Sequence, residues 1–305
     1  MFRNHFILQL KRALIAMTVG LCALGFARAA SAFTFTTIDD PDATLGTDVQ
    51  AIDSPGDLVG FFADSVGEGT HGFEMDKHGN FTTFDVPVAV SGTEAFALND
   101  SGEIVGLFFD DVGFGIHGFI LSKKGDFTVV DDPDALQQTV LFGVNSSGDI
   151  VGAFGNNTGS GEHGLLLTKK GDFTTIDDPL GIFGTEAIGI DASDNIVGKY
   201  FDDTGSGIHG YLLSKKGVFT TIDVPGSTGG TEADGISASG QIVGTFRDTT
   251  GSGVHGFELT TKGVFITIDV PGSDGTIVGG INSQGQISGT FTDTMGVTHG
   301  FIATP

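Results

Sequence analysis

The fold of this chain is decided by residues 97–133, which read ALNDSGEIVGLFFDDVGFGIHGFILSKKGDFTVVDDP. Three short motifs stand out in this stretch. They are Ile104-Val105-Gly106, His117-Gly118-Phe119, and a Phe-x-x-x-Asp motif from Phe127 to Asp131. All three recur, with changes, along most of the chain, so the sequence has to be considered first as an internal repeat.

The three motifs recur at a nearly constant spacing. The Phe-x-x-x-Asp motif begins at Phe35, Phe81, Phe127, Phe173, Phe219 and Phe265, always 46 residues apart. The His-Gly pair falls at His71, His117, His163, His209, His255 and His299, with a last step of 44 residues. The glycine of the Ile-Val-Gly motif recurs at Gly60, Gly106, Gly152, Gly198, Gly244 and Gly289. A fixed period of this length is the signature of a repeat protein.

Each repeat has the pattern of four antiparallel strands. In the repeat quoted above, the expected strands are residues 95–98, 103–109, 117–122 and 127–131. Gly102 lies in the first turn, where a hairpin needs a positive φ. The second strand is apolar on both faces, because neighbours such as Ile104 and Val105 point in opposite directions. A sheet buried on both sides needs another sheet on each side, as in stacked blades.

The two ends of the chain complement each other. Residues 33–39 form a lone strand of the fourth type, and the last repeat ends after its third strand, at residues 299–303. The first strand therefore supplies what the last repeat lacks, and closing the ring removes exposed sheet edges.

The repeat length also fits propeller blades, which run to roughly 40–50 residues. We therefore predict an all-β chain: a six-bladed β-propeller of 46-residue four-stranded repeats, closed by the N-terminal strand. Residues 33–305 are expected to form this single domain. An open β-solenoid is the alternative.

Residues 1–32 have the features of a signal peptide. A basic start is followed by an apolar run at residues 13–26 and by Ala30-Ser31-Ala32, a typical cleavage site. The apolar run is shorter than the ~20 residues that span a bilayer, so we expect no membrane span. Cys22 is the only cysteine. We predict a secreted, extracellular or periplasmic protein without disulfides.

The mature chain is strongly acidic. Residues 1–32 hold four of the 14 basic residues and none of the 38 acidic ones, so 10 against 38 leaves a net charge of −28. This charge argues against nucleic acid and against anionic membranes as partners, since both require basic side chains. It is compatible with cations, basic partners or simple solubility. We expect a monomer.

The recurring histidines and aspartates invite a metal interpretation. The histidines lie on the third strand from the axis, too far apart to converge on one ion, and are expected to bond to nearby loops. Paired aspartates in the loops after the second strands resemble calcium loops only loosely, with Kd of about 10⁻⁴ to 10⁻³ M at best. These weak calcium candidates are Asp110, Asp111, Asp202 and Asp203. No other cofactor is expected.

No residue pattern in the sequence argues for catalysis. A catalytic pair on a propeller is expected to depart from the repeat at one or two blades, and no departure of this kind is evident in the Asp-rich segments. No G-x-S-x-G elbow and no phosphate-binding loop is present. We therefore predict no catalytic and no cofactor-binding residue. A calcium-dependent or carbohydrate-active propeller enzyme, a hydrolase or lyase, is the alternative.

The loops that join the fourth strand of one repeat to the first strand of the next, here called inter-unit loops, differ among the copies. Three of them are apolar, and they carry Val88, Val90, Leu136, Leu180, Ile182 and Phe183. Exposed apolar patches often mark partner sites, although these side chains could instead cap the blade ends. The hypothesis is a non-catalytic binding or scaffold module, with a protein or cell-surface partner on the acidic face.

The repeat resembles the HAF-repeat family of bacterial extracellular proteins. The resemblance rests on residues 99–106 (NDSGEIVG) with 117–119 (HGF), and on residues 239–244 (SGQIVG) with 255–257 (HGF). It covers almost all of residues 33–305. The chain departs from the family in having glycine for alanine in the HAF triplet, and Leu165 or Tyr211 for phenylalanine in two copies. The resemblance implies export and a repeat architecture, and it implies no activity.

Overall fold

The computed structural model describes residues 33–64, 69–110, 115–136, 138–156, 161–204, 207–249 and 253–305. The expected signal peptide at 1–32 lies outside the described residues. In the described part of the chain, all regular elements are β-strands, as predicted. No helix in that part is long and apolar enough to cross a membrane.

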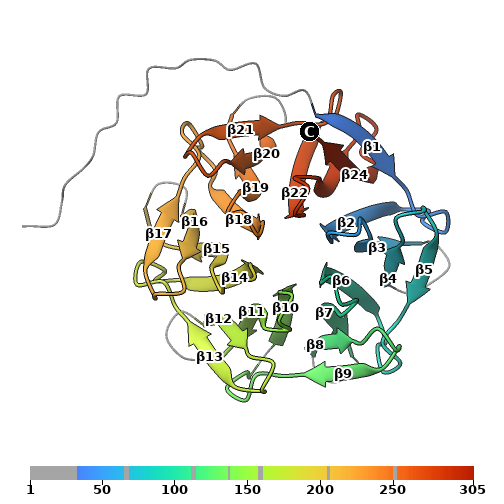
Figure 1. The fold of residues 1–305 in the computed structure, drawn as a ribbon, viewed down its shortest axis with the longest axis horizontal. Helices are drawn as coiled ribbons and strands as arrows, with labels where there is room; N and C mark the ends of the chain where they lie inside the picture. Colours follow the sequence, from blue (N-terminus) through green and yellow to red (C-terminus); the bar gives the residue numbers. More distant parts are fainter. Residues whose placement is uncertain are drawn as a thin grey trace, which may run out of the picture. The chain divides into compact units, whose positions relative to one another are not determined.

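Consecutive strands form antiparallel four-stranded units (Figure 1). Unit 1 contains β2 (Gly46–Ile52), β3 (Leu58–Ala63), β4 (Thr70–Met75) and β5 (Phe81–Phe84). Unit 2 contains β6 (Gly92–Leu98), β7 (Ile104–Phe109), β8 (Ile116–Leu121) and β9 (Phe127–Val130). Unit 3 contains β10 (Gln138–Val144), β11 (Ile150–Gly155), β12 (Glu162–Leu167) and β13 (Phe173–Ile176).

The remaining strands repeat this arrangement. Unit 4 contains β14 (Gly184–Ile190), β15 (Ile196–Phe201), β16 (Ile208–Leu213) and β17 (Phe219–Ile222). Unit 5 contains β18 (Thr231–Ile236), β19 (Ile242–Arg247), β20 (Val254–Leu259) and β21 (Phe265–Ile268). The last group contains β22 (Gly275–Ile281), β23 (Ile287–Thr292) and β24 (Thr298–Thr304), and β24 pairs antiparallel with β1 (Thr34–Ile38). Figure 1 shows the first strand of each unit innermost and the fourth at the periphery.

The core lies between neighbouring units. In β7, Val105 is fully buried and packs with Leu141 and Leu165 of unit 3. Ile104 and Phe108, on the other face of β7, belong to a cluster that includes Val59 of unit 1. The prediction that the second strand of the repeat is buried on both faces is therefore confirmed.

The innermost strand of each unit contains a β-bulge opposite the glycine of the Ile-Val-Gly motif. In unit 2 the register shifts between Ala95 and Ala97, and Gly106 pairs with Ala95. A Cβ atom at Gly106 would overlap the carbonyl oxygen of Glu94. The same overlap would occur at the equivalent glycines Gly60, Gly152, Gly198, Gly244 and Gly289. The glycine recurs because the bulged backbone occupies the space of a side chain.

We expect the substitution Gly106→Ala to destabilise the protein by about 1–3 kcal/mol, because the backbone of β6 must move to accept a methyl group. Urea unfolding of the variant and the wild type measures this difference. Gly125→Asn is the control: Gly125 has φ +87° with open space around it, a conformation that asparagine tolerates. Equal stability of Gly106→Ala and the wild type would contradict the packing argument.

Candidate functional site

A cavity of about 290 Å³ lies among the innermost strands. Each unit contributes the one residue that is skipped in the pairing at its β-bulge. These six residues are Gln50, Phe96, Phe142, Ile188, Asp234 and Gly279, and all six line the cavity. Bulges often redirect a side chain next to an active site. Here the six bulged residues, called the inner ring below, line the cavity.

The inner ring is not symmetric. Phe96 and Phe142 form an aromatic wall, with ring centroids 5.4 Å apart, and Phe61 packs edge-on against Phe96. Asp234 is on β18, which lies opposite β6, the strand that carries Phe96 (Figure 1). The cavity therefore has an aromatic side and a charged side.

The charged side is built around Lys199 on β15. Its Nζ lies 3.3 Å from Glu186 on β14, directly opposite in register, and 3.0 Å from Glu232 on β18 of the next unit. Glu232 also forms an ion pair with Arg247 at the end of β19. The side chains of Lys199, Glu186 and Glu232 are only 19%, 12% and 15% exposed, so solvent screens these charges weakly. One lysine thus joins two carboxylates from neighbouring units.

The two glutamates have different pKa values because their surroundings differ. Burial raises the pKa of Glu186 to about 7, although the charge of Lys199 opposes the shift. Burial also acts on Glu232, yet Lys199 and Arg247 outweigh it and hold the pKa of that carboxyl below its usual value. Burial raises the pKa of Asp234, and the charge of Glu232 adds to the effect. At neutral pH the cluster therefore combines a proton donor with an ionised carboxylate.

The expected absence of a catalytic departure from the repeat concerned the Asp-rich segments, and the departures lie instead on the strands that line the cavity. Other units have Phe61, Leu107, Ala153, Thr245 or Thr290 at the register position of Lys199. Asp234 and Arg247 are also unlike their equivalents in the other units. The signal was present in the sequence, as a lysine within an apolar strand and an arginine at the end of another. It is visible only when the copies are compared position by position.

The recurring histidines bond to nearby loops, as predicted. His117 Nδ1 lies 2.8 Å from Asp131, and its Nε2 lies 3.2 Å from Asp110. Its ring also stacks on Phe108 at 5.3 Å. The Nδ1 contact recurs from His71, His163, His209, His255 and His299 to Asp85, Asp177, Asp223, Asp269 and Asp39. The histidine and Phe-x-x-x-Asp motifs therefore form one structural contact in each repeat.

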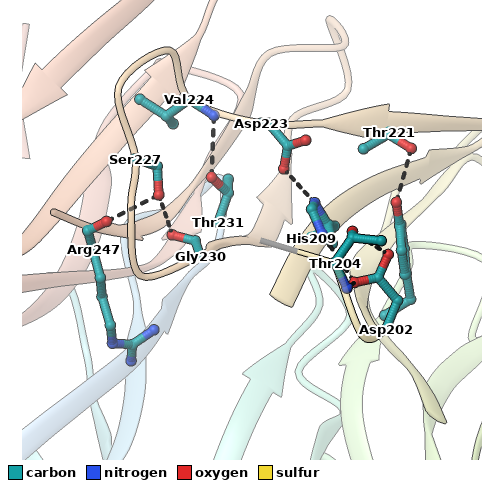
Figure 2. Close-up of polar contacts among 11 residues, drawn as sticks. Asp202, Thr204, His209, Thr221, Asp223, Val224, Ser227, Gly230, Thr231 and Arg247 are labelled. Atoms are coloured by element: carbon teal, nitrogen blue, oxygen red, sulfur yellow. Dashed lines mark hydrogen bonds and ion pairs between the residues drawn. The ribbon is translucent and has the colours of Figure 1, made fainter. Parts of the chain in front are cut away.

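The calcium candidates do not form a common site. Figure 2 shows Asp202 beside Thr204 and His209: its carboxylate accepts hydrogen bonds from Thr204 N at 2.8 Å and Thr204 Oγ1 at 2.7 Å. Asp110 contacts His117, Asp203 is exposed, and Asp111 lies outside the described residues. Within the described ranges, no group of three or more His, Cys, Asp or Glu side chains is arranged to hold a metal ion.

The apolar residues of the inter-unit loops are exposed rather than packed over the units. They are Val88, Val90, Leu136, Leu180, Ile182 and Phe183. The loops themselves are fixed by a threonine of the following strand: Thr93 Oγ1, for example, accepts a hydrogen bond from Val86 N at 3.0 Å. The same contact joins Thr231 to Val224 at 3.1 Å (Figure 2).

No protein-family model and no curated protein matches the sequence. Solved structures match over most of its length. A triple mutant of AofleA from Arthrobotrys oligospora is 14% identical, with 88% of this chain and 86% of that chain covered and a TM-score of 0.55. A mutant of the Aleuria aurantia lectin in complex with Fucα1-6GlcNAc is 11% identical, with 86% of this chain and 93% of that chain covered and a TM-score of 0.52.

Virginiamycin B lyase from Staphylococcus aureus is 12% identical, with 90% of this chain and 100% of that chain covered and a TM-score of 0.50. These solved structures are β-propellers. The chain has a β-propeller fold. The predicted β-propeller class is thereby confirmed, and at these identities the likeness shows the fold alone.

The expectation of a non-catalytic binding or scaffold module with a protein partner on the acidic face is corrected. The solved β-propellers that resemble this chain include a lectin in complex with a sugar and a lyase. In this chain, moreover, the departures from the repeat gather in the central cavity, at Lys199, Asp234 and Arg247. The expectation rested on differences among the inter-unit loops and took the strands of the six copies to be equivalent.

Proposed function

We propose that this protein is a carbohydrate-active enzyme, a glycoside hydrolase whose acid–base pair is Glu186 and Glu232. The observation that carries the proposal is the position of Lys199, within 3.3 Å of Glu186 and 3.0 Å of Glu232. The two carboxyl groups lie near one cation, and their pKa values are shifted in opposite directions. Such a pair can supply the acid and the base of a reaction.

The assignment of roles follows from the protonation states. Glu186, with a pKa of about 7, retains a proton near neutral pH and would donate it to the glycosidic oxygen as the C–O bond breaks. Glu232 stays ionised and would stabilise or attack the anomeric carbon, and water then completes the cleavage. Lys199 and Arg247 keep Glu232 ionised, and Lys199 also fixes the orientation of Glu186.

The shape and chemistry of the cavity suit a sugar. A pyranose ring has an apolar face that packs on aromatic rings, and hydroxyl groups that bond to charged side chains. Phe96 and Phe142 provide the aromatic surface, and the Lys199 cluster lies on the charged side. A cavity of about 290 Å³ is small, so we expect it to hold one or two rings of a longer sugar chain.

The test of this proposal is hydrolysis of a panel of 4-methylumbelliferyl glycosides by the wild type and by Glu186→Gln and Glu232→Gln. We expect both variants to lose about 100-fold or more in kcat/KM, the usual contribution of a general acid or base. The activity of the wild type should fall as the pH rises through about 7, because Glu186 then loses the proton that it donates.

Glu94→Gln is the matched control, because Glu94 occupies in β6 the register position of Glu186 in β14. This variant should keep the activity of the wild type. Thermal melting of all four proteins separates loss of catalysis from loss of folding. The proposal fails if no glycoside is cleaved, or if Glu186→Gln, correctly folded, cleaves as fast as the wild type.

We also propose the finer architecture predicted from the sequence, a six-bladed ring closed by the N-terminal strand. Support comes from the antiparallel pairing of β1 with β24 and from the 2.8 Å contact between Asp39 and His299. Further support comes from two hydrogen bonds between the last group of strands and unit 1. They join Thr290 Oγ1 to Asp48 at 2.9 Å and Asn282 Nδ2 to the carbonyl oxygen of Asp53 at 3.0 Å.

Export of the protein is likewise a proposal. Its support is the basic and apolar pattern of residues 1–32 with the Ala30-Ser31-Ala32 cleavage site, together with the resemblance of the repeats to the HAF-repeat family. A carbohydrate-active enzyme outside the cytoplasm would meet polymeric sugars directly.

A further inference from the structure

The charges that line the central cavity do not balance. Among the described residues, the ionisable side chains that line it are three acids, Glu186, Glu232 and Asp234, and two bases, Lys199 and Arg247. Both bases are engaged with glutamates: Lys199 contacts Glu186 and Glu232, and Arg247 contacts Glu232. Asp234 is hydrogen-bonded to the uncharged hydroxyl of Thr245. With all groups ionised, the cluster therefore carries one excess negative charge.

An excess charge at a site that protein surrounds is costly unless a cation or a proton neutralises it. Without a ligand, protonation of Glu186 or Asp234 neutralises the excess charge, since burial raises the pKa of both carboxyls. A positively charged group on a ligand bound beside Asp234 would favour the ionised form of that carboxylate and release the proton of Asp234. The groups that face Asp234 from its own strand and its neighbours are Glu232, Lys199, Glu186 and Thr245.

The position of Asp234 makes it accessible to a ligand. It is the bulged residue of β18, in the inner ring of the cavity, and it retains exposed surface there. The equivalent residues in the two preceding units are Ile188 and Phe142. The aromatic rings of Phe96 and Phe142 can also attract a cation through their faces. The carboxylate and the aromatic wall thus both favour a cationic ligand.

We propose that the substrate is an amino sugar with a protonated amine, and that Asp234 is the residue that selects it by pairing with the ammonium group. This inference rests on the proposed function and names its substrate class. A neutral or N-acetylated sugar would leave the excess charge of the cavity unmatched, and an acidic sugar would increase it. The net charge of −28 in residues 33–305, 10 basic against 38 acidic, also attracts cationic sugars over longer distances.

The test compares the binding of two probes, the glucosamine tetramer and its fully N-acetylated counterpart, by titration calorimetry at pH 7. We expect the wild type to bind the glucosamine tetramer about 10- to 100-fold more tightly, the range for a hydrogen bond to a charged group. Binding of the glucosamine tetramer should release the proton of Asp234. The measured heat of binding should therefore differ between phosphate and Tris buffers. Binding of the N-acetylated tetramer should show no such difference.

Asp234→Asn removes the charge with little change of shape. We expect this variant to bind the two tetramers within about twofold of each other, with no dependence of the heat on the buffer. Glu94→Gln, the control, should keep both the preference and the proton release. Equal affinity of the wild type for both tetramers would overturn the inference, and so would an unchanged preference in Asp234→Asn.

The outcome for this inference can be separated from the outcome for the proposed function. Cleavage of neutral glycosides without preference for the amine would support the hydrolase and overturn the role of Asp234. Tight, proton-releasing binding of the glucosamine tetramer without cleavage would support the amine site and overturn the hydrolase. The melting temperature of each variant shows that the comparison is made on folded protein.

Discussion

Deletion of residues 34–38, the whole of β1, is expected to abolish cooperative folding of residues 33–305. The strand pairs with β24 along its full length, from Thr34 opposite Thr304 to Ile38 opposite Gly300. Ile38 is buried in the core of unit 1, and the ring of Phe35 packs on Phe301 at 5.8 Å. Deletion would therefore expose core side chains and leave β24 as an open edge.

The size of the expected effect follows from these contacts. Burial of a large apolar side chain contributes roughly 1.5–3 kcal/mol, and each backbone hydrogen bond adds about 1 kcal/mol. The loss of two large apolar side chains and a strand pairing of five residues is comparable to the whole stability of a domain, about 5–15 kcal/mol. Thermal melting followed by circular dichroism measures it, and we expect no cooperative transition above room temperature.

Thr36→Ser/Thr37→Ser is the control, because both side chains are exposed and the strand is retained. A synthetic peptide of residues 33–39 should restore a cooperative transition when added to the deleted chain, since it can occupy the vacant place beside β24. A deletion variant that melts like the intact chain would show that closure by β1 contributes nothing to stability, and would favour an open solenoid.

The strands and turns could be predicted from the sequence because the same apolar pattern and turn glycines recur in each repeat. Alternating apolar residues in 103–109 and a glycine at Gly102 suffice to place a strand and its turn, and the observed β7 begins one residue later. The role of His117 was predictable for the same reason, since loop aspartates recur beside each copy. Repetition makes such features visible even without any other sequence to compare.

The site was not predictable in this way, for two physical reasons. The β-bulge that directs Asp234 into the channel depends on backbone pairing, and no residue type specifies it, since Gln50, Phe96 and Gly279 occupy the same place. The cluster also joins residues of different strands and units, such as Lys199 and Glu232. The departures of Lys199 and Arg247 from the repeat are visible in the sequence, but their proximity to Glu232 is not.

Lys199→Leu is expected to have the largest effect of any single substitution in the channel. Leucine is the residue at the equivalent position of unit 2, Leu107, so the strand itself should accept it. Without the lysine, however, Glu186 and Glu232 lie buried beside each other with Arg247 as the remaining cation. Removing one partner from a buried ion pair costs about 3–5 kcal/mol.

This cost should depend on pH with a definite sign. In the wild type, the pKa of Glu186 is raised to about 7 from 4.5, so its ionisation already lowers stability as the pH rises between these values. Glu232 acts in the opposite direction, because its lowered pKa gives stability above about 4.5 that is lost as the pH falls. Loss of Lys199 raises both pKa values and moves the destabilising ionisation of the glutamates to higher pH.

Urea unfolding at pH 5 and pH 8 tests this expectation. Lys199→Leu should lose about 3–5 kcal/mol at pH 8 and distinctly less at pH 5, where the glutamates can be buried in their neutral form. Lys199→Arg should retain most of the stability, because it keeps the charge. The triple variant Lys199→Leu/Glu186→Gln/Glu232→Gln should recover most of the loss at pH 8, because no unpaired glutamate charge remains. An equal loss at both pH values, or no recovery in the triple variant, would mean that charge pairing does not hold the cluster together.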